Sequence, residues 1–311
     1  DSIKEIVPRY LLPLRGVIDS TDIPLNVSRS ALQTDRKVRS ISSFISKKIA
    51  NKLKDLLKNN PDFYAEIWDS ISAFVKIGVM EDEKFSELAQ NSIIFETKLG
   101  SDLVKEEEIE NKFLIKFNDK FFTTLENYSN RNNKNDDNKI IYCTDEISQS
   151  NALNLWLSNN REVIKADPLI DAQFIPWLES QNEKYKFQRV DSEINDDLEK
   201  DSPEIVDKDG KSNTDNIKEI ITKALNNEKV TVKVQSLKNK NAPPALILLP
   251  EQMRRINDMG AYMEQKIPGL PEYHVLLVNK DHPLINGLIK FTDKKIILNE
   301  NGSNESPLTG R

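Results

Sequence analysis

The feature that most constrains the fold is an alternation of short apolar strands and helices between residues 140 and 190. Apolar runs at residues 140–143, 163–165 and 185–190 suit strands, whereas residues 148–160 and 171–179 have the apolar spacing of helices. Alternation of this kind favours a small α/β unit with a largely parallel sheet. We therefore expect a mixed α/β (α+β) fold.

Helices precede this unit. In the first of them the apolar residues recur at spacings of three and four, with Lys, Arg and Ser between them: Val38, Ile41, Ile45, Ile49, Leu53 and Leu56. Residues 61–76 and 81–90 predict two more helices, and residues 92–97 predict a strand. A further helix is expected within residues 106–128, although the middle of that segment is rich in β formers. Its apolar residues lie four apart: Ile109, Phe113, Phe117 and Phe121.

The pattern divides the chain into residues 1–190, an acidic linker at residues 191–215, and a second domain at residues 216–311. The linker has many acids and few apolar residues, which is typical of a solvated segment. In the second domain we expect helices at 216–225, 250–266 and 283–291. Strands are expected at 230–234, 245–249 and 273–278.

The composition excludes several classes of protein. The chain has 311 residues and a net charge of −6, which argues against a general nucleic-acid binder because such a protein needs a basic surface. No apolar run approaches the ~20 residues of a membrane span, and no signal peptide is visible at the start. The single cysteine, Cys143, lies in an apolar strand and predicts a buried thiol in a reducing compartment. With one Cys, His274 and His282, a zinc site is not expected.

The most distinctive stretch lies near the start of the chain. Residues 14–18 are apolar and suit a short strand. Residues 19–26 have the residue types of a loop, and the long helix follows. Arg29 therefore lies near the start of a helix, where a cation is disfavoured because the helix N-terminus is itself partly positive. An anion nearby would resolve this conflict, and the rigid guanidinium of Arg suits a phosphate.

This stretch reads Asp19-Ser-Thr-Asp-Ile-Pro-Leu-Asn-Val-Ser-Arg-Ser-Ala-Leu-Gln33. It resembles the catalytic loop in the middle domain of the Hsp90 chaperones, most closely the bacterial HtpG type. The resemblance implies that Arg29 reaches ATP held by a separate N-terminal domain and that Gln33 assists. The family usually has Glu directly after this Arg, whereas this chain has Ser30.

The order of elements extends the resemblance over nearly the whole chain, but only the loop is a highly specific motif. Residues 1–190 resemble the later part of the middle domain, and residues 216–311 resemble most of the C-terminal domain. We therefore expect a piece of a longer protein, without its nucleotide-binding domain, the first part of its middle domain and its final dimerising helices. The resemblance implies a cytoplasmic homodimeric stress chaperone that uses ATP and Mg²⁺. The piece alone is expected to be monomeric, to bind no ATP, and to bind neither nucleic acid nor a membrane.

Two apolar groups are candidates for contact with unfolded or partly folded client proteins. Met253, Ile256, Met259 and Met263 lie in the helix expected at residues 250–266, and Met is the adaptable residue of promiscuous surfaces. Phe174 and Trp177 lie in a second region where the family is thought to touch clients. In both places, packing in the core would produce the same helical spacing. Client contact and core packing therefore both remain possible.

Two other functions remain possible from the sequence. The sequence has no phosphate-binding Gly loop and no convincing Ser, His and acid constellation, which fits an arginine that acts on a nucleotide held elsewhere. The transducer domain of a gyrase-type DNA-handling ATPase would act similarly, but it commonly uses Lys and needs basic surface. A non-enzymatic scaffold is the third possibility. An ATP-binding domain encoded upstream would exclude the scaffold.

Overall fold

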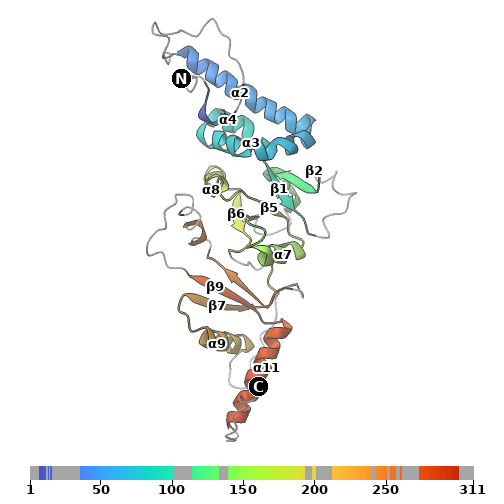
Figure 1. Cartoon of the computed structure of the whole chain (residues 1–311), viewed down its shortest axis with the longest axis vertical. Coiled ribbons are helices and arrows are strands. Elements are labelled where there is room, and N and C mark those ends of the chain that lie inside the picture. The colour runs from blue at the N-terminus through green and yellow to red at the C-terminus, as the bar shows by residue number, and fades with distance from the viewer. Residues whose placement is uncertain are drawn as a thin grey trace. The chain divides into compact units, whose positions relative to one another are not determined.

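A computed structural model describes residues 7–11, 13, 15, 36–100, 114–132, 139–192, 198–200, 212–239, 242–250, 253–256, 260 and 273–300. The chain divides into two compact units. The first unit contains residues 1–144 and 162–187, and the second contains residues 145–161 and 188–311. Figure 1 shows helices and strands in both units, so the expected mixed α/β class is confirmed.

The first unit opens with a cluster of helices: η1 (Arg9–Leu11), α2 (Arg36–Asn59), α3 (Pro61–Glu81), α4 (Glu83–Ala89) and η2 (Gln90–Ser92). Asn60 caps α3 by accepting a hydrogen bond from the Phe63 amide, and Pro61 follows at a position that needs no amide hydrogen. Asp82 ends α3 and also caps α4, because its carboxylate accepts from the Phe85 amide. These caps fix the sharp turns from α2 into α3 and from α3 into the short helix α4.

The sheet of this unit has six strands in the order β2-β3-β1-β5-β4-β6. They are β1 (Ile94–Lys98), β2 (Ile115–Phe117), β3 (Lys120–Thr124), β4 (Lys139–Cys143), β5 (Val163–Lys165) and β6 (Lys186–Arg189). Strands β4 and β5 pair in parallel, but the β1–β3, β2–β3 and β1–β5 pairs are antiparallel. The parallel pairing expected within residues 140–190 is thus found for β4 and β5, whereas β1, β2 and β3, which precede that segment, join the sheet in antiparallel pairs.

The helix expected within residues 106–128 is also wrong where the structure describes it. Residues 115–124 form the β2–β3 hairpin, with Lys116 opposite Phe121, and α6 (Leu125–Asn132) begins directly afterwards. Asn118 turns the chain with a φ of 52°, a left-handed conformation that Asn tolerates better than most residues. The spacing of four between Phe117 and Phe121 thus spans a hairpin turn.

Large apolar side chains from the helices and the sheet form one core in the first unit. Its largest fully buried members include Tyr64, Phe85, Phe95, Phe122 and Phe174. The helix α8 (Asp171–Gln181) adds Phe174, Ile175 and Leu178 to this core. Cys143, the single cysteine of the chain, is buried, as the strand pattern predicted.

The second unit contains a three-stranded sheet in the order β7-β9-β8. Its elements are α7 (Ser150–Ser158), α9 (Asn213–Leu225), β7 (Val230–Gln235), β8 (Ala245–Leu248), β9 (His274–Asn279) and α11 (Pro283–Glu300). β7 runs parallel to β9, and β8 runs antiparallel to it. A small core joins the sheet to α9 and α11 through Ile217, Val232, Val278 and Ile285.

Part of the expected acidic linker packs against the second unit. Leu198 is fully buried, and Glu199 forms an isolated β-bridge with Leu237. The Lys200 amide donates to the Ser236 carbonyl over 2.9 Å, and the Lys238 amide donates to the Leu198 carbonyl over 3.0 Å. Residues 145–161 also belong to the second unit, whereas the order of elements had placed them in the first.

Candidate functional site

The candidate catalytic loop, with Arg29 and Gln33, lies outside the described residues, which end at residue 15 before it and resume at residue 36 after it. Tyr10 lies before the loop and is buried against α3 and α4. Its hydroxyl donates to Asp82 Oδ2 over 2.7 Å and shares a 3.0 Å hydrogen bond with Ser46 of α2, the helix that follows the loop. The chain before the loop and the helix after it are therefore bound to the same cluster.

A close approach to α3 makes this anchor possible. A Cβ on Gly78 would lie 2.5 Å from Cδ2 of Tyr10, so a side chain there would displace the ring. The Tyr10 and Phe85 rings lie 5.0 Å apart. Burial raises the pKa of the Tyr10 hydroxyl above its usual value, and the Asp82 carboxylate adds to this effect, so Tyr10 stays a neutral donor.

Helix α8 carries Phe174 and Trp177, and the structure separates their roles. Phe174 is fully buried, which places it in the core, and its ring stacks on that of Trp177 at 5.8 Å with an angle of 17°. Trp177 packs against the core but remains partly exposed. Of the two candidate residues on α8, only Trp177 is therefore exposed at the surface in this conformation, and Phe174 packs against its ring from the core.

A buried ion pair lies next to Phe174. Lys76 of α3 and Asp171 of α8 lie 2.7 Å apart between Nζ and Oδ1, and their side chains are 5% and 1% exposed. The Lys76 ammonium also lies 4.7 Å from the ring centre of Phe95 and 5.7 Å from that of Phe174. Burial raises the pKa of the Asp171 carboxyl, and the charge of Lys76 opposes this shift without cancelling it.

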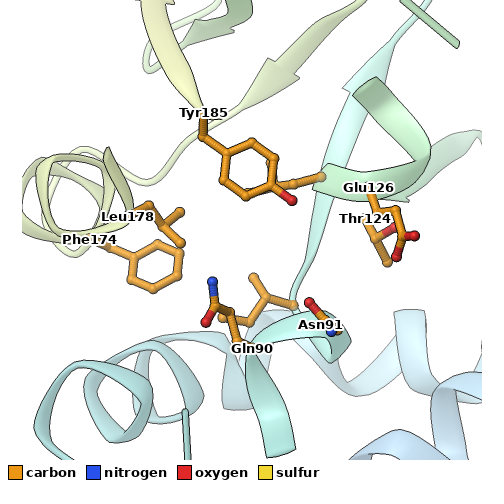
Figure 2. A pocket seen from close by; sticks show the side chains of 9 residues that line it. Gln90, Asn91, Thr124, Glu126, Phe174, Leu178 and Tyr185 are labelled. Atoms are coloured by element: carbon orange, nitrogen blue, oxygen red, sulfur yellow. The ribbon is translucent and has the colours of Figure 1, made fainter. Parts of the chain in front are cut away.

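A small cavity lies on another side of Phe174. Figure 2 shows the rings of Phe174 and Tyr185 and the side chain of Gln90 pointing into the same space, with Leu178 beside Phe174. Its volume of about 20 Å³ is enough for one water molecule and too small for a nucleotide or a peptide side chain. Burial raises the pKa of Tyr185, and the Glu126 charge adds to that shift. We therefore regard this cavity as a packing feature.

The methionine-bearing helix is described only in part. Residues 253–256 and residue 260 are helical, as the sequence predicted. Met253 and Ile256 are each partly exposed there, so neither is fully enclosed by the core. Met259 and Met263 lie outside the described residues.

Two kinds of feature are absent from the described residues. No helix among them is long and apolar enough to cross a membrane. Within the same residues, no three His, Cys, Asp or Glu side chains converge in a way that could hold a metal ion.

The sequence reasoning missed the groups that support the loop and α8. Asp82 carried a usable signal, because an Asp directly before a Glu-rich helical start is typical of an N-cap. Lys76 carried another, because it interrupts the apolar run Phe74-Val75-Lys76-Ile77 on a core-facing helix. Nothing in the local sequence predicts that Tyr10 pairs with Asp82 or that Lys76 pairs with Asp171.

Comparison with known protein families identifies the class of protein to which this fold and loop sequence belong. The Hsp90 protein family matches the chain over residues 1–301. The chain therefore belongs to the Hsp90 family.

The relatives specify the type within the family. The chain is 33% identical over 318 residues to Chaperone protein HtpG of Porphyromonas gingivalis, which covers 99% of this chain and 42% of that protein. Identity to the Bacteroides fragilis (strain 638R) protein of the same name is 33%, over 95% of this chain and 42% of the relative. For the Treponema denticola protein it is 30%, over 96% and 44%. The resemblance to the bacterial HtpG type is thereby confirmed, and the chain spans less than half the length of these relatives.

Proposed function

We propose that this chain is part of an ATP-dependent molecular chaperone that binds unfolded or partly folded proteins. The observation that carries the proposal is the string from Asp19 to Gln33 in a chain of the Hsp90 family. The relatives named above are chaperones by name. Family membership also favours this function over the gyrase-type transducer.

In this proposal Arg29 acts on ATP that a separate N-terminal domain holds with Mg²⁺. A guanidinium placed against the terminal phosphate stabilises the charge that develops there during transfer to water. Gln33 assists in positioning. The double attachment of Tyr10 to Ser46 and Asp82 supports this role, because a loop whose flanks are fixed loses less conformational freedom when it reaches the nucleotide.

Client binding is assigned to Trp177 and to the helix with Met253, Ile256, Met259 and Met263. The partial exposure of Trp177, Met253 and Ile256 supports this assignment. Apolar contacts of this kind are non-directional, so a chaperone can hold and release many different sequences. We propose that the whole protein works as a cytoplasmic homodimer.

The test compares the isolated chain with the whole protein. Calorimetric titration of the isolated chain with Mg-ATP should give no saturable signal, because the nucleotide pocket is assigned to another domain. The whole protein should hydrolyse ATP and should suppress aggregation of a thermally unfolded model protein. A micromolar ATP site in the isolated chain would contradict the assignment of roles, and a whole protein without ATPase activity would favour the scaffold.

A further inference from the structure

The outer edge of β7 in the second unit is only partly paired. β7 lies at one end of the β7-β9-β8 order, so β9 covers one of its two edges. The carbonyl of Gln235 accepts from the amide of Lys280, directly after β9, so the odd-numbered residues of β7 point toward β9. Backbone groups of successive strand residues point to opposite edges, and those of Val232 and Val234 therefore point outward. Within the part of the chain that the structure describes, no backbone hydrogen bond covers these outward groups.

Residues 198–200, which we call the strap, occupy the end of this edge. The Lys200 amide donates to the Ser236 carbonyl, and the Lys238 amide donates to the Leu198 carbonyl. The two hydrogen bonds flank an antiparallel bridge. Positions 236 and 238 continue the even-numbered, outward-pointing series of β7, so the strap is paired as a short added strand.

Side chains of the strap are recognised as well as its backbone. Leu198 is fully buried and serves as an anchor. Gln235 Nε2 donates to Glu199 Oε2 over 2.7 Å. Gln235 Oε1 and Ser236 Oγ, however, are buried and have no hydrogen-bond partner among the described residues. The strap therefore satisfies this edge only in part.

The strap is short enough to be replaced. Two backbone hydrogen bonds, one buried side chain and one side-chain contact hold it. A longer extended polypeptide in the same register would make these contacts and would also pair with the outward groups of Val234 and Val232. In strand addition of this kind, main-chain hydrogen bonds give affinity and pockets for alternate side chains give specificity.

We propose that the outer edge from Val232 to Lys238 binds an extended polypeptide by antiparallel strand addition and that the strap blocks this site. The ligand carries an aliphatic residue in place of Leu198 and an acceptor, Glu or Gln, in place of Glu199. Its biological role rests on the proposed client binding, because unfolded proteins offer such extended segments. The binding itself is a property of the second unit and can be measured without nucleotide.

The experiment is an NMR titration of the 311-residue chain with a blocked peptide that has the sequence of residues 195–202, Asn-Asp-Asp-Leu-Glu-Lys-Asp-Ser. The register of the strap places the last peptide residue opposite Val234. The control peptide has Ser in place of Leu and the same charge. The Leu peptide should shift the amides of Val234, Ser236 and Lys238 in a saturable way, and the Ser peptide should bind at least tenfold more weakly.

A matched pair of variants tests whether the strap blocks the site. Lys200→Pro removes the amide that donates to Ser236, whereas Lys200→Ala keeps it, and the Lys200 side chain is exposed. The Leu peptide should bind the Lys200→Pro chain with a dissociation constant of about 1 mM. Wild type and Lys200→Ala should bind it about tenfold more weakly, because a strap that is closed for roughly nine-tenths of the time reduces the apparent affinity by that factor.

A second variant keeps the test decisive if Lys200→Pro loses its cooperative thermal melt. Glu199→Ala removes the contact with Gln235 and leaves the backbone unchanged. It should loosen the strap and strengthen binding of the Leu peptide about threefold relative to wild type.

Equal binding of the Leu peptide to chains with an intact and a weakened strap would overturn the proposal. Equal binding of the two peptides, or shifts confined to residues away from this edge, would overturn it as well. Failure here is distinguishable from failure of the proposed chaperone function. If the whole protein suppresses aggregation while the Leu peptide does not bind, only the strand-addition site is wrong. If the peptide binds while the whole protein does not suppress aggregation, the site stands and the chaperone function is wrong.

Discussion

The Tyr10 hydroxyl donates a 2.7 Å hydrogen bond to Asp82, a residue 72 positions further along the chain. Asp82 also caps α4, so one carboxylate holds both the start of a helix and the segment that precedes the candidate catalytic loop. Ser46 of α2 shares the other hydrogen bond of the Tyr10 hydroxyl. A single buried tyrosine thus connects η1, which precedes this loop in the chain, to α2, which follows it.

Tyr10→Phe removes this connection and keeps the ring. The free energy of unfolding of the first unit should fall by about 1–2 kcal/mol, because Asp82 and Ser46 each lose a partner in a partly desolvated place. Urea denaturation followed by circular dichroism measures this. Tyr185→Phe is the matched control, because the Tyr185 hydroxyl makes no hydrogen bond to any residue that the structure describes, and it should cost less than about 0.5 kcal/mol. Equal losses in the two variants would show that the Tyr10 hydroxyl contributes little.

The pair of Lys76 and Asp171 should show strong coupling. Lys76→Met alone leaves a buried carboxylate without its cation and should lower the free energy of unfolding by about 3–5 kcal/mol. Lys76→Met combined with Asp171→Leu should cost far less than the sum of the two single changes, because no charge is then buried.

The exposed pair of Glu219 and Lys223 on α9 provides the control for this cycle. Its side chains are 45% and 75% exposed, so Lys223→Met should cost less than about 0.5 kcal/mol. Additive effects of the changes at positions 76 and 171, measured by urea denaturation, would contradict the coupling.

Asp171 also predicts a pH dependence with a definite sign. Burial raises the pKa of this carboxyl in the folded protein above its value in the unfolded chain, which is about 3.9. The folded protein therefore binds this proton more tightly, so the stabilising contribution is full below the unfolded pKa and is lost as the pH rises through the folded pKa.

Asp171→Asn cannot titrate and therefore serves as the reference. The wild-type protein should gain free energy of unfolding relative to Asp171→Asn as the pH falls from about 7 to about 4. Denaturant titrations of both proteins across this range measure the difference. A change in the opposite direction would mean that the attraction of Lys76 outweighs burial and that the pKa is lowered.

The methionine helix should contribute to client binding without being needed for folding. Each covered apolar side chain gives roughly 1.5–3 kcal/mol before the costs of association, so the patch should bind clients with micromolar or weaker affinity. Met253→Glu together with Met259→Glu should weaken aggregation suppression about tenfold in effective concentration and leave a cooperative melt.

Ile247→Glu is a suitable control, because Ile247 is an apolar residue that is 67% exposed on β8 of the same unit. It should leave aggregation suppression unchanged. Loss of the cooperative melt in the methionine variant would show that this helix face belongs to the core.

Local patterns predicted most of the fold. The spacing of apolar residues predicted α2, and the run from Val163 to Lys165 predicted β5 with its observed bounds. The hairpin at residues 115–124 was missed because Phe117 and Phe121 are four apart in sequence, and periodicity alone cannot distinguish a helical turn from a hairpin turn. Asn118 is a residue type that favours turns, and it could have indicated the hairpin.

Local sequence patterns could not predict which distant residues contact one another in the folded protein. Leu198 is one apolar residue in an acidic stretch, and nothing local predicts that it is buried against the second unit. Phe174 and Trp177 look alike in sequence, but their different burial depends on α3 and the sheet, which the spacing on α8 cannot reveal. The pairing of Lys76 with Asp171 joins residues 95 positions apart.

The proposed action of Arg29 on ATP is tested most directly by the rate of ATP hydrolysis by the whole protein with Arg29→Ala. We expect a loss of tenfold or more, which is about 1.4 kcal/mol of transition-state stabilisation, with a smaller change in nucleotide affinity and a milder effect of Gln33→Ala. Arg39→Ala, which removes an exposed arginine of α2, is the control and should keep the wild-type rate. An Arg29→Ala protein that hydrolyses ATP at the wild-type rate would show that Arg29 does not act on the nucleotide.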